Sequence, residues 1–338
     1  MSSENVNIGA EPTGIPLFLR KSSLEVNGWR IPHFPRIDDP VVHIHKIQEL
    51  PIREDDVLIA AYPKSGTHWL WEVTHMLLNQ TTEYEKRVKE QVMLEFAGAL
   101  EAVEKEPSPR ILNSHLVFPH LPLEVITKKI KIIHVTRNPK DTLVSLYHHF
   151  KQLTPRASFT FDLLLKTVME NNIMFPSQYD YLRQMTEFEQ THPDHPIKHI
   201  YFEEMKKDPV KTISSLAKFL GVPASDTFCQ HVAEACSFDN MKRVEDEGKK
   251  VMPKSMVDSL DQRGQTPAGV KQLDGGMPPH GGSPPHHGGK RPPAKMSFYR
   301  KGVVGDWKNS FTPEQSLEFD NYIKMEENKG FPFKFEYE

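Results

Sequence analysis

The stretch Tyr62-Pro63-Lys64-Ser65-Gly66-Thr67-His68-Trp69 decides the fold class, because it joins a strand pattern directly to a helix pattern. The preceding run Val57-Leu58-Ile59-Ala60-Ala61 is short, apolar and partly β-branched, which predicts a buried strand. After the turn, apolar residues recur at helical spacing, at Leu70, Val73 and Leu77. A helix that begins there points free backbone N–H groups and the positive end of its dipole at the turn. The turn is therefore predicted to bind an anion such as phosphate or sulfate.

This turn differs from a Walker A loop, in which a Lys stands directly before the Ser or Thr and directly after a Gly. Here Lys64 follows Pro63 instead of a Gly and precedes Ser-Gly-Thr, and position 60 is an alanine. Lys64 adds a point charge to the predicted site, and Ser65 and Thr67 add hydroxyl donors. The spacing alone leaves one alternative open, a tight strand-to-helix turn with a solvated Lys.

A second strand-to-helix turn also carries a cation. Ile130-Lys131-Ile132-Ile133-His134-Val135 reads as a buried strand, and Thr136-Arg137-Asn138-Pro139-Lys140-Asp141 turns into a helix. In this turn Asn138 suits the N-cap and Pro139 the first helical position. Arg137 stands at the end of the strand, where open α/β sheets bind their ligands. Alone it is equally compatible with a surface salt bridge, but two such turns favour a ligand with two anionic groups.

At these residues the chain resembles the cytosolic sulfotransferases, which use 3′-phosphoadenosine 5′-phosphosulfate (PAPS) as sulfuryl donor. The family's Tyr-Pro-Lys-Ser-Gly-Thr-x-Trp loop corresponds to Tyr62–Trp69. Its Arg followed eight residues later by a Ser corresponds to Arg137 and Ser145, and its Arg-Lys-Gly-x-x-Gly-Asp-Trp motif to residues 300–307. The resemblance runs from about residue 40 to the C-terminus and indicates a divergent, invertebrate-like member.

The resemblance implies a role for each matching residue. His115, which ends the predicted strand Arg110–Leu116, would be the general base, and Lys64 would stabilise the leaving oxygen. Read without the family, a histidine such as His115 is more often a partly buried structural residue whose hydrogen bonds are satisfied. The nucleotide-binding residues implied by the family are Lys64, Ser65, Gly66, Thr67, His68, Trp69, Arg137, Ser145, Ser237, Phe238, Met241, Arg300, Lys301 and Gly302. No metal is expected, because side chains and backbone amides supply the positive charge.

The chain departs from the family pattern at several positions. Asn113 replaces a Lys that usually helps to neutralise the transferring group, and it can donate a hydrogen bond but no charge. Cys236 and Phe202 replace a Thr and a Tyr that usually contact adenine. The family's dimer motif, Lys-x-x-x-Thr-Val-x-x-x-Glu, is altered in residues 308–317, so a homodimer is possible but not indicated.

Composition agrees with a cytoplasmic enzyme. The formal net charge is −3, which argues against general nucleic-acid binding, and no apolar run reaches membrane-spanning length. The first residues are polar and acidic, unlike a signal peptide. Cys229 and Cys236 are the only cysteines, which fits a reducing compartment.

The chain is predicted to form a single α/β domain with a central parallel sheet flanked by helices and a P-loop-like nucleotide site. Residues 1–40 are expected to form a flexible arm and an irregular segment, followed by a sulfotransferase domain over residues 41–338. Within it, residues 197–202 read as a further parallel strand, 161–190 as two helices and 86–106 as helical.

A Pro/Gly/His-rich stretch at about residues 262–295 reads as a flexible loop insertion that modulates access to the site. Its histidines are weak compositional evidence for a metal site; they are His280, His286 and His287.

The implied reaction is sulfuryl transfer from PAPS to the hydroxyl of a small, hydrophobic acceptor, such as a phenol, a steroid or another alcohol. One alternative is a nucleotide-binding protein with little or no transfer activity, motivated by Asn113. Another is a P-loop phosphotransferase, which would need Mg²⁺ ligands and a Walker A lysine.

Overall fold

The computed structural model describes residues 24–31, 37–96, 98–153, 159–173, 175–248, 297–330 and 332–338. Within these residues a four-stranded parallel sheet has the order β4-β3-β5-β6. Its strands are β3 (Val57–Ala61), β4 (Ile111–Ser114), β5 (Lys131–Thr136) and β6 (Ile197–Tyr201). The predicted α/β class and the parallel sheet are therefore confirmed.

The strands pair in a register that aligns their carboxyl ends. Ala60 lies opposite Ser114 on one side and His134 on the other, and Val135 lies opposite Ile200. Residues that follow the strands therefore meet at one edge of the sheet. This edge brings together the predicted anion turn after β3, His115 after β4 and Arg137 after β5.

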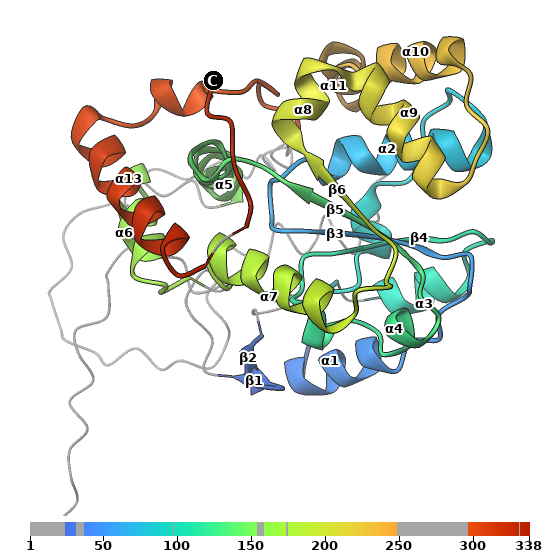
Figure 1. The fold of residues 1–338 in the computed structure, drawn as a ribbon, viewed down its shortest axis with the longest axis horizontal. Coiled ribbons are helices and arrows are strands. Elements are labelled where there is room, and N and C mark those ends of the chain that lie inside the picture. Colours follow the sequence, from blue (N-terminus) through green and yellow to red (C-terminus); the bar gives the residue numbers. More distant parts are fainter. Residues whose placement is uncertain are drawn as a thin grey trace, which may run out of the picture.

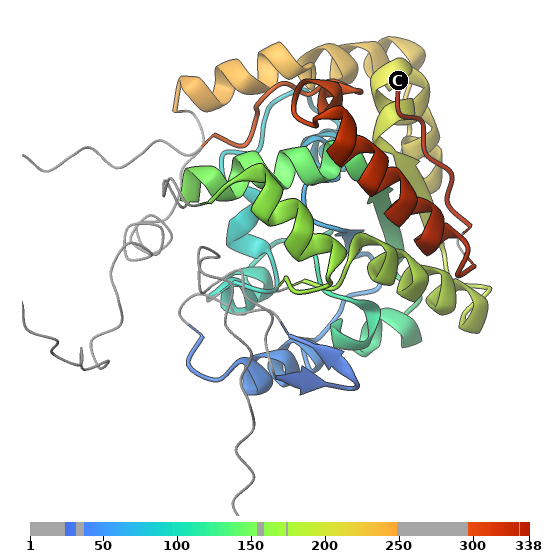
Figure 2. The same cartoon turned by 90° about the vertical axis from the view of Figure 1, so that its left-hand side faces the viewer.

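Helices cover both faces of the sheet (Figure 1). One face carries α2 (Thr67–Asn79), α9 (Pro209–Leu220), α10 (Asp226–Ala235) and α11 (Phe238–Asp246), and α8 (Phe202–Lys207) leads into this layer. The other carries α1 (Pro40–Gln48), α4 (Glu124–Thr127), α5 (Pro139–Leu153), α6 (Phe161–Met169), α7 (Gln178–Thr191) and α13 (Pro313–Glu327). Figure 2 shows α5, α6 and α13 lying close to one another at one end of the molecule.

The core consists of two apolar clusters, one on each face. Leu58 and Ala60 of β3 belong to one, and Ile59 and Ala61 to the other. All five residues of β3 are buried, as expected for a central parallel strand covered on both faces. The local signals at α9 are also confirmed, because Asp208 caps its start and Gly221 ends it in the left-handed conformation.

Residues 86–106 depart from the predicted helix. Among residues 86–96 and 98–106, the helical elements are the 3₁₀ turn η2 (Lys89–Val92) and the short helix α3 (Ala99–Glu104). Between the two, Met93 forms a parallel bridge with Asn113, and the Leu94 N–H donates to the Asn113 carbonyl at 3.1 Å. The segment lies against the end of β4, and this long-range pairing replaces local helix hydrogen bonds.

The N-terminal region contains a short hairpin, β1 (Glu25–Val26) and β2 (Trp29–Arg30), where the sequence suggested an irregular segment. Two further 3₁₀ turns are η3 (Phe118–His120) and η5 (Asp306–Asn309). The predicted insertion at 262–295, with its three histidines, and most of the arm lie outside the described residues. None of the helices in the described ranges is long and apolar enough to cross a membrane.

Candidate functional site at the carboxyl edge of the sheet

The turn after β3 has a backbone shaped for an anion. Lys64 and Gly66 both have positive φ, 69° and 117°, and the strained Lys64 conformation is one that functional turns often hold. A Cβ on Gly66 would lie 3.0 Å from the Phe202 ring, so only glycine fits there. Gly66 is the N-cap of α2, and none of the described side chains caps this helix start. Its first N–H groups are therefore available to a ligand.

Two buried hydrogen-bond donors near this edge are unsatisfied among the described residues. The Ser65 hydroxyl and the Arg137 Nε have no hydrogen-bond partner within the described residues, and both side chains are buried. Unsatisfied buried donors are costly, and an anionic ligand would satisfy both. The residues present therefore fit a nucleotide that carries two anionic groups, as PAPS does.

His115 directly follows β4 and is held by backbone contacts. Its Nδ1 lies 2.7 Å from the carbonyl of Ala61, the last residue of β3. Because a carbonyl can only accept, Nδ1 carries the proton and Nε2 keeps its lone pair. Burial and, after it, the charge of Lys89 lower the pKa of His115 to about 3. The ring is therefore neutral and can accept a proton at Nε2.

Three residues that the sequence analysis missed lie beside this histidine. The Glu95 carboxylate accepts hydrogen bonds from the His115 backbone N–H and, at 3.0 Å, from the Ser114 hydroxyl. The other two, Lys89 and Glu90, belong to η2 and are buried. Long-range contacts bring this segment to the strand end, among them the bridge between Met93 and Asn113 and the hydrogen bonds to Glu95, so periodicity along the chain could not locate it.

His68, in the first turn of α2, faces protein groups. Its Nε2 lies 2.9 Å from Glu90 Oε1, and its ring packs on Phe298 with centroids 4.5 Å apart. Burial lowers the pKa of His68 to about 4, so the ring is neutral. Burial and the neighbouring Lys89 also lower the pKa of Lys64, to about 8. An anion bound at the turn would raise the pKa of Lys64 and hold it charged.

Arg137 is stacked on an aromatic ring. Its guanidinium carbon lies 4.1 Å from the centroid of Phe202, the same ring that packs against Gly66. Phe202 therefore connects the two cationic turns, and it supports the guanidinium by a cation–π contact. One Arg137 nitrogen donates to the Val303 carbonyl at 3.0 Å, which leaves Nε without a partner among the described residues.

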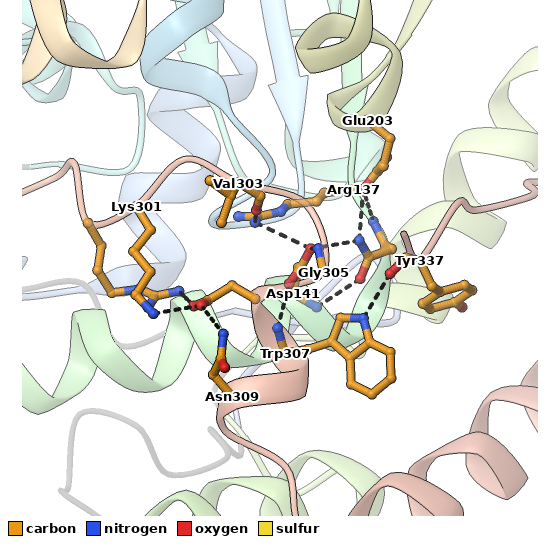
Figure 3. A network of polar contacts seen from close by, with 12 residues as sticks. Arg137, Asp141, Glu203, Lys301, Val303, Gly305, Trp307, Asn309 and Tyr337 are labelled. Atoms are coloured by element: carbon orange, nitrogen blue, oxygen red, sulfur yellow. Dashed lines mark hydrogen bonds and ion pairs between the residues drawn. The ribbon is translucent and has the colours of Figure 1, made fainter.

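The 300–307 motif is clamped to the start of α5 (Figure 3). The two oxygens of the Asp141 carboxylate accept hydrogen bonds from the backbone N–H groups of Gly305 and Trp307, each at 2.9 Å. The Asn138 side chain caps α5 by accepting from the Asp141 N–H, as its sequence position predicted. Further along α5, Gln152 pairs with the backbone of Ser297. The segment 297–307 thus runs along α5.

Arg300 and Lys301 are paired with one carboxylate. Arg300 lies 2.5 Å and Lys301 2.7 Å from the two oxygens of Asp306. Hydrogen bonds from Lys301, Asn309 and Arg300 lower the pKa of Asp306 to about 2 despite its burial. Ser145 lies on α5 four residues after Asp141, so the two share a face of that helix, and Arg137 stands just before its start. These cations could gather around one phosphate group.

The residues implied for the adenine side lie near α11. Ser237 caps this helix, Met241 is buried in the core beneath it, and Trp69 packs at the edge of the same cluster. Gly302 meets the Phe238 ring so closely that a Cβ would lie 2.3 Å from it. Among the described residues, no group of three or more His, Cys, Asp or Glu side chains is arranged to hold a metal ion.

Comparisons with known proteins agree with this geometry. A model of the sulfotransferase domain matches residues 54–272 and 289–332. Sulfotransferase 1A1 of Mus musculus is 30% identical over 329 residues, covering 94% of this chain and 98% of that protein. The amine sulfotransferase of Oryctolagus cuniculus is 29% identical over 298 residues, covering 86% and 87%.

Among solved structures, mouse sulfotransferase SULT7A1 complexed with PAP superposes with a TM-score of 0.62. It is 26% identical, and the match covers 93% of this chain and 95% of that one. The chain therefore belongs to the sulfotransferase family.

Proposed function

We propose that this sulfotransferase moves the sulfuryl group of PAPS to the hydroxyl of a small hydrophobic acceptor, with His115 as general base. One observation carries the proposal. The Nδ1 of His115 is held by the carbonyl of Ala61, the residue at which β3 leads into the anion turn. The base and the turn are thereby fixed to each other through backbone groups, which preorganises them.

In this mechanism Nε2 of His115 takes the proton of the acceptor hydroxyl as its oxygen bonds to sulfur. The bond from sulfur to the 5′-phosphate oxygen breaks, and the nucleotide leaves as 3′-phosphoadenosine 5′-phosphate (PAP). Lys64 and the N–H groups at the start of α2 stabilise the charge that develops on the leaving oxygen. The negative charge of the bound donor also raises the pKa of His115 from its low value in the free protein.

The nucleotide-binding set is proposed to divide between two ends of the ligand. Ser65, Gly66, Thr67 and the His68 backbone N–H would hold the 5′-phosphosulfate end. The 3′-phosphate would lie among cations of two segments, because Arg137 binds a carbonyl of the 300–307 motif. The members of this second group are Arg137, Ser145, Arg300, Lys301 and Gly302. Trp69, Ser237, Phe238 and Met241 would enclose adenine.

The acceptor is proposed to be a phenol, a steroid or another small alcohol. The family resemblance supports this class. Because one relative is an amine sulfotransferase, an aromatic amine belongs in the same panel. We further propose a cytoplasmic enzyme that works without a metal; its two cysteines are buried and neither is in a disulfide, which fits a reducing compartment.

Transfer of radiolabelled sulfate from PAPS to this panel tests the proposal. We expect product with at least one acceptor and none when His115 is replaced by alanine. PAP binding, measured by calorimetry, should survive that replacement. If the wild-type protein binds PAP but transfers sulfate to no acceptor, a nucleotide-binding protein becomes the better description, as the neutral Asn113 would allow.

A further inference from the structure

Lys89 is a buried cation with few polar partners among the described residues. Its side chain is 2% exposed, and its Nζ lies 3.3 Å from Glu90 Oε1. Within the described part of the chain, Nζ also contacts the Met93 sulfur at 4.0 Å, which is a weak acceptor. Burying an ammonium group is expensive unless it is well paired and hydrogen-bonded. Among the described residues, Glu90 is the carboxylate within ion-pair distance of this ammonium, and it is shared with His68, so the position of Lys89 is difficult to explain by stability alone.

The surroundings of Lys89 place it at the transfer site. The Glu90 oxygen that pairs with Lys89 lies 2.9 Å from Nε2 of His68, in the first turn of α2. Met93, which contacts the Lys89 ammonium, is bridged to Asn113 at the end of β4. Lys89 therefore lies between the anion turn and the strand that positions His115. In agreement, its charge lowers the pKa values of Lys64, His68 and His115.

Asn113 does not supply the positive charge that this location needs. Its side chain is fully buried, and neither its amide nitrogen nor its oxygen has a hydrogen-bond partner in the described part of the chain. An amide nitrogen can donate hydrogen bonds here but brings no charge. During transfer, negative charge grows on the leaving phosphate oxygen and spreads over the sulfuryl oxygens, where a second cation beside Lys64 would stabilise it.

We propose that the ammonium of Lys89 supplies this second cation, acting from η2 in place of a charged side chain at position 113. The inference rests on the proposed function, since it gives Lys89 a role in the same reaction. In it, Lys89 interacts with the sulfuryl group itself, and Glu90 holds the ammonium in place between the first turn of α2 and β4. A nucleotide without the sulfuryl group should gain little from Lys89.

The test compares PAPS with PAP in three variants and two control variants. In Lys89→Met we expect PAPS affinity, measured without acceptor, to fall about ten-fold while PAP affinity changes less than about two-fold. The turnover number should fall about 10²-fold, as for loss of a transition-state donor. Lys89→Arg should keep most of the activity. Adding Asn113→Lys to Lys89→Met should raise the turnover number at least about ten-fold above that of Lys89→Met, because it returns a cation to the strand end.

Two controls separate catalysis from folding. Lys86→Met removes an exposed lysine of the same segment and should change neither affinity nor rate. Lys89→Met combined with Glu90→Gln removes the buried ion pair without leaving an unpaired charge, and it should show the same selective loss of PAPS affinity. The inference would be overturned if Lys89→Met and Lys89→Met/Glu90→Gln each lost as much affinity for PAP as for PAPS and if Asn113→Lys did not restore the rate.

A failure of the proposed function can be distinguished from a failure of the role proposed for Lys89. A wild-type protein that transfers sulfate to no acceptor would refute that function alone, while the ratio of PAPS to PAP affinity would still decide the role of Lys89. Normal wild-type transfer with an unchanged ratio and rate in Lys89→Met would refute only the present inference.

Discussion

Replacing Glu95 by glutamine should remove a pH dependence of stability that originates in the site itself. The Glu95 side chain is 4% exposed, and one of its oxygens has no hydrogen-bond partner among the described residues. Burial raises the pKa of Glu95 from 4.5 to about 7, although hydrogen bonds from His115 and Ser114 act in the opposite direction. Glutamine keeps the acceptor oxygen for these two bonds and cannot ionise.

The sign and size of the effect follow from linkage. Because the folded state holds the Glu95 proton more tightly than the unfolded state does, this stabilisation is full below pH 4.5 and is lost as the pH rises to about 7. With these two pKa values, the loss between about pH 5.5 and about pH 8.5 amounts to about 2 kcal/mol. Between these two pH values, the free energy of unfolding of the wild-type protein should therefore fall by about 2 kcal/mol more than that of the Glu95→Gln variant.

Urea unfolding followed by tryptophan fluorescence at the two pH values measures this difference. Glu124→Gln is the matched control, because the Lys128 hydrogen bond lowers the pKa of Glu124 and keeps it ionised throughout the range. Relative to the wild-type protein, the free energy of unfolding of Glu124→Gln should change by a similar amount at both pH values. Parallel pH dependence of wild type and Glu95→Gln would refute the raised pKa and the buried environment assigned to this carboxyl group.

Three further predictions concern the proposed site. His115→Ala should lower transfer at least about 10²-fold while PAP affinity, measured by calorimetry, stays within about three-fold; full activity would refute the base assignment. Arg137→Ala should weaken PAP binding at least about ten-fold more than binding of adenosine 5′-phosphate, which lacks the 3′-phosphate; equal losses would place Arg137 elsewhere. Gly302→Ala should lower PAP affinity because its Cβ would lie 2.3 Å from the Phe238 ring at a φ of +63°. Adding Phe238→Leu should not fully restore it, since the backbone strain remains, and full recovery would contradict the strain.

Local signals were sufficient for most of the sheet and its helices. The apolar runs at 57–61 and 130–135 predicted β3 and β5, because buried parallel strands are rich in apolar residues. The run at 197–202 predicted β6, which is partly buried at the edge of the sheet. Asp208, Pro209 and Gly221 likewise marked the ends of α9, since capping depends on residues next to the helix. At residues 86–106 the same approach was wrong. There the chain pairs with β4 across many residues of sequence, and charged side chains turn inward where a periodic pattern assigns them to solvent.

The amino-acid sequence by itself determined the order of strands and helices and the cation at each of two strand ends, because these depend on neighbours along the chain. It also indicated the family through three short motifs. Only the tertiary structure decided that Phe202 lies under Arg137 and against Gly66, that Asp141 anchors the 300–307 motif, and that Met93, a neighbour of Lys89, is bridged to β4. Each of these contacts joins segments far apart in sequence. Their partners are chosen by packing and by the need to satisfy buried charges, and no local pattern records either.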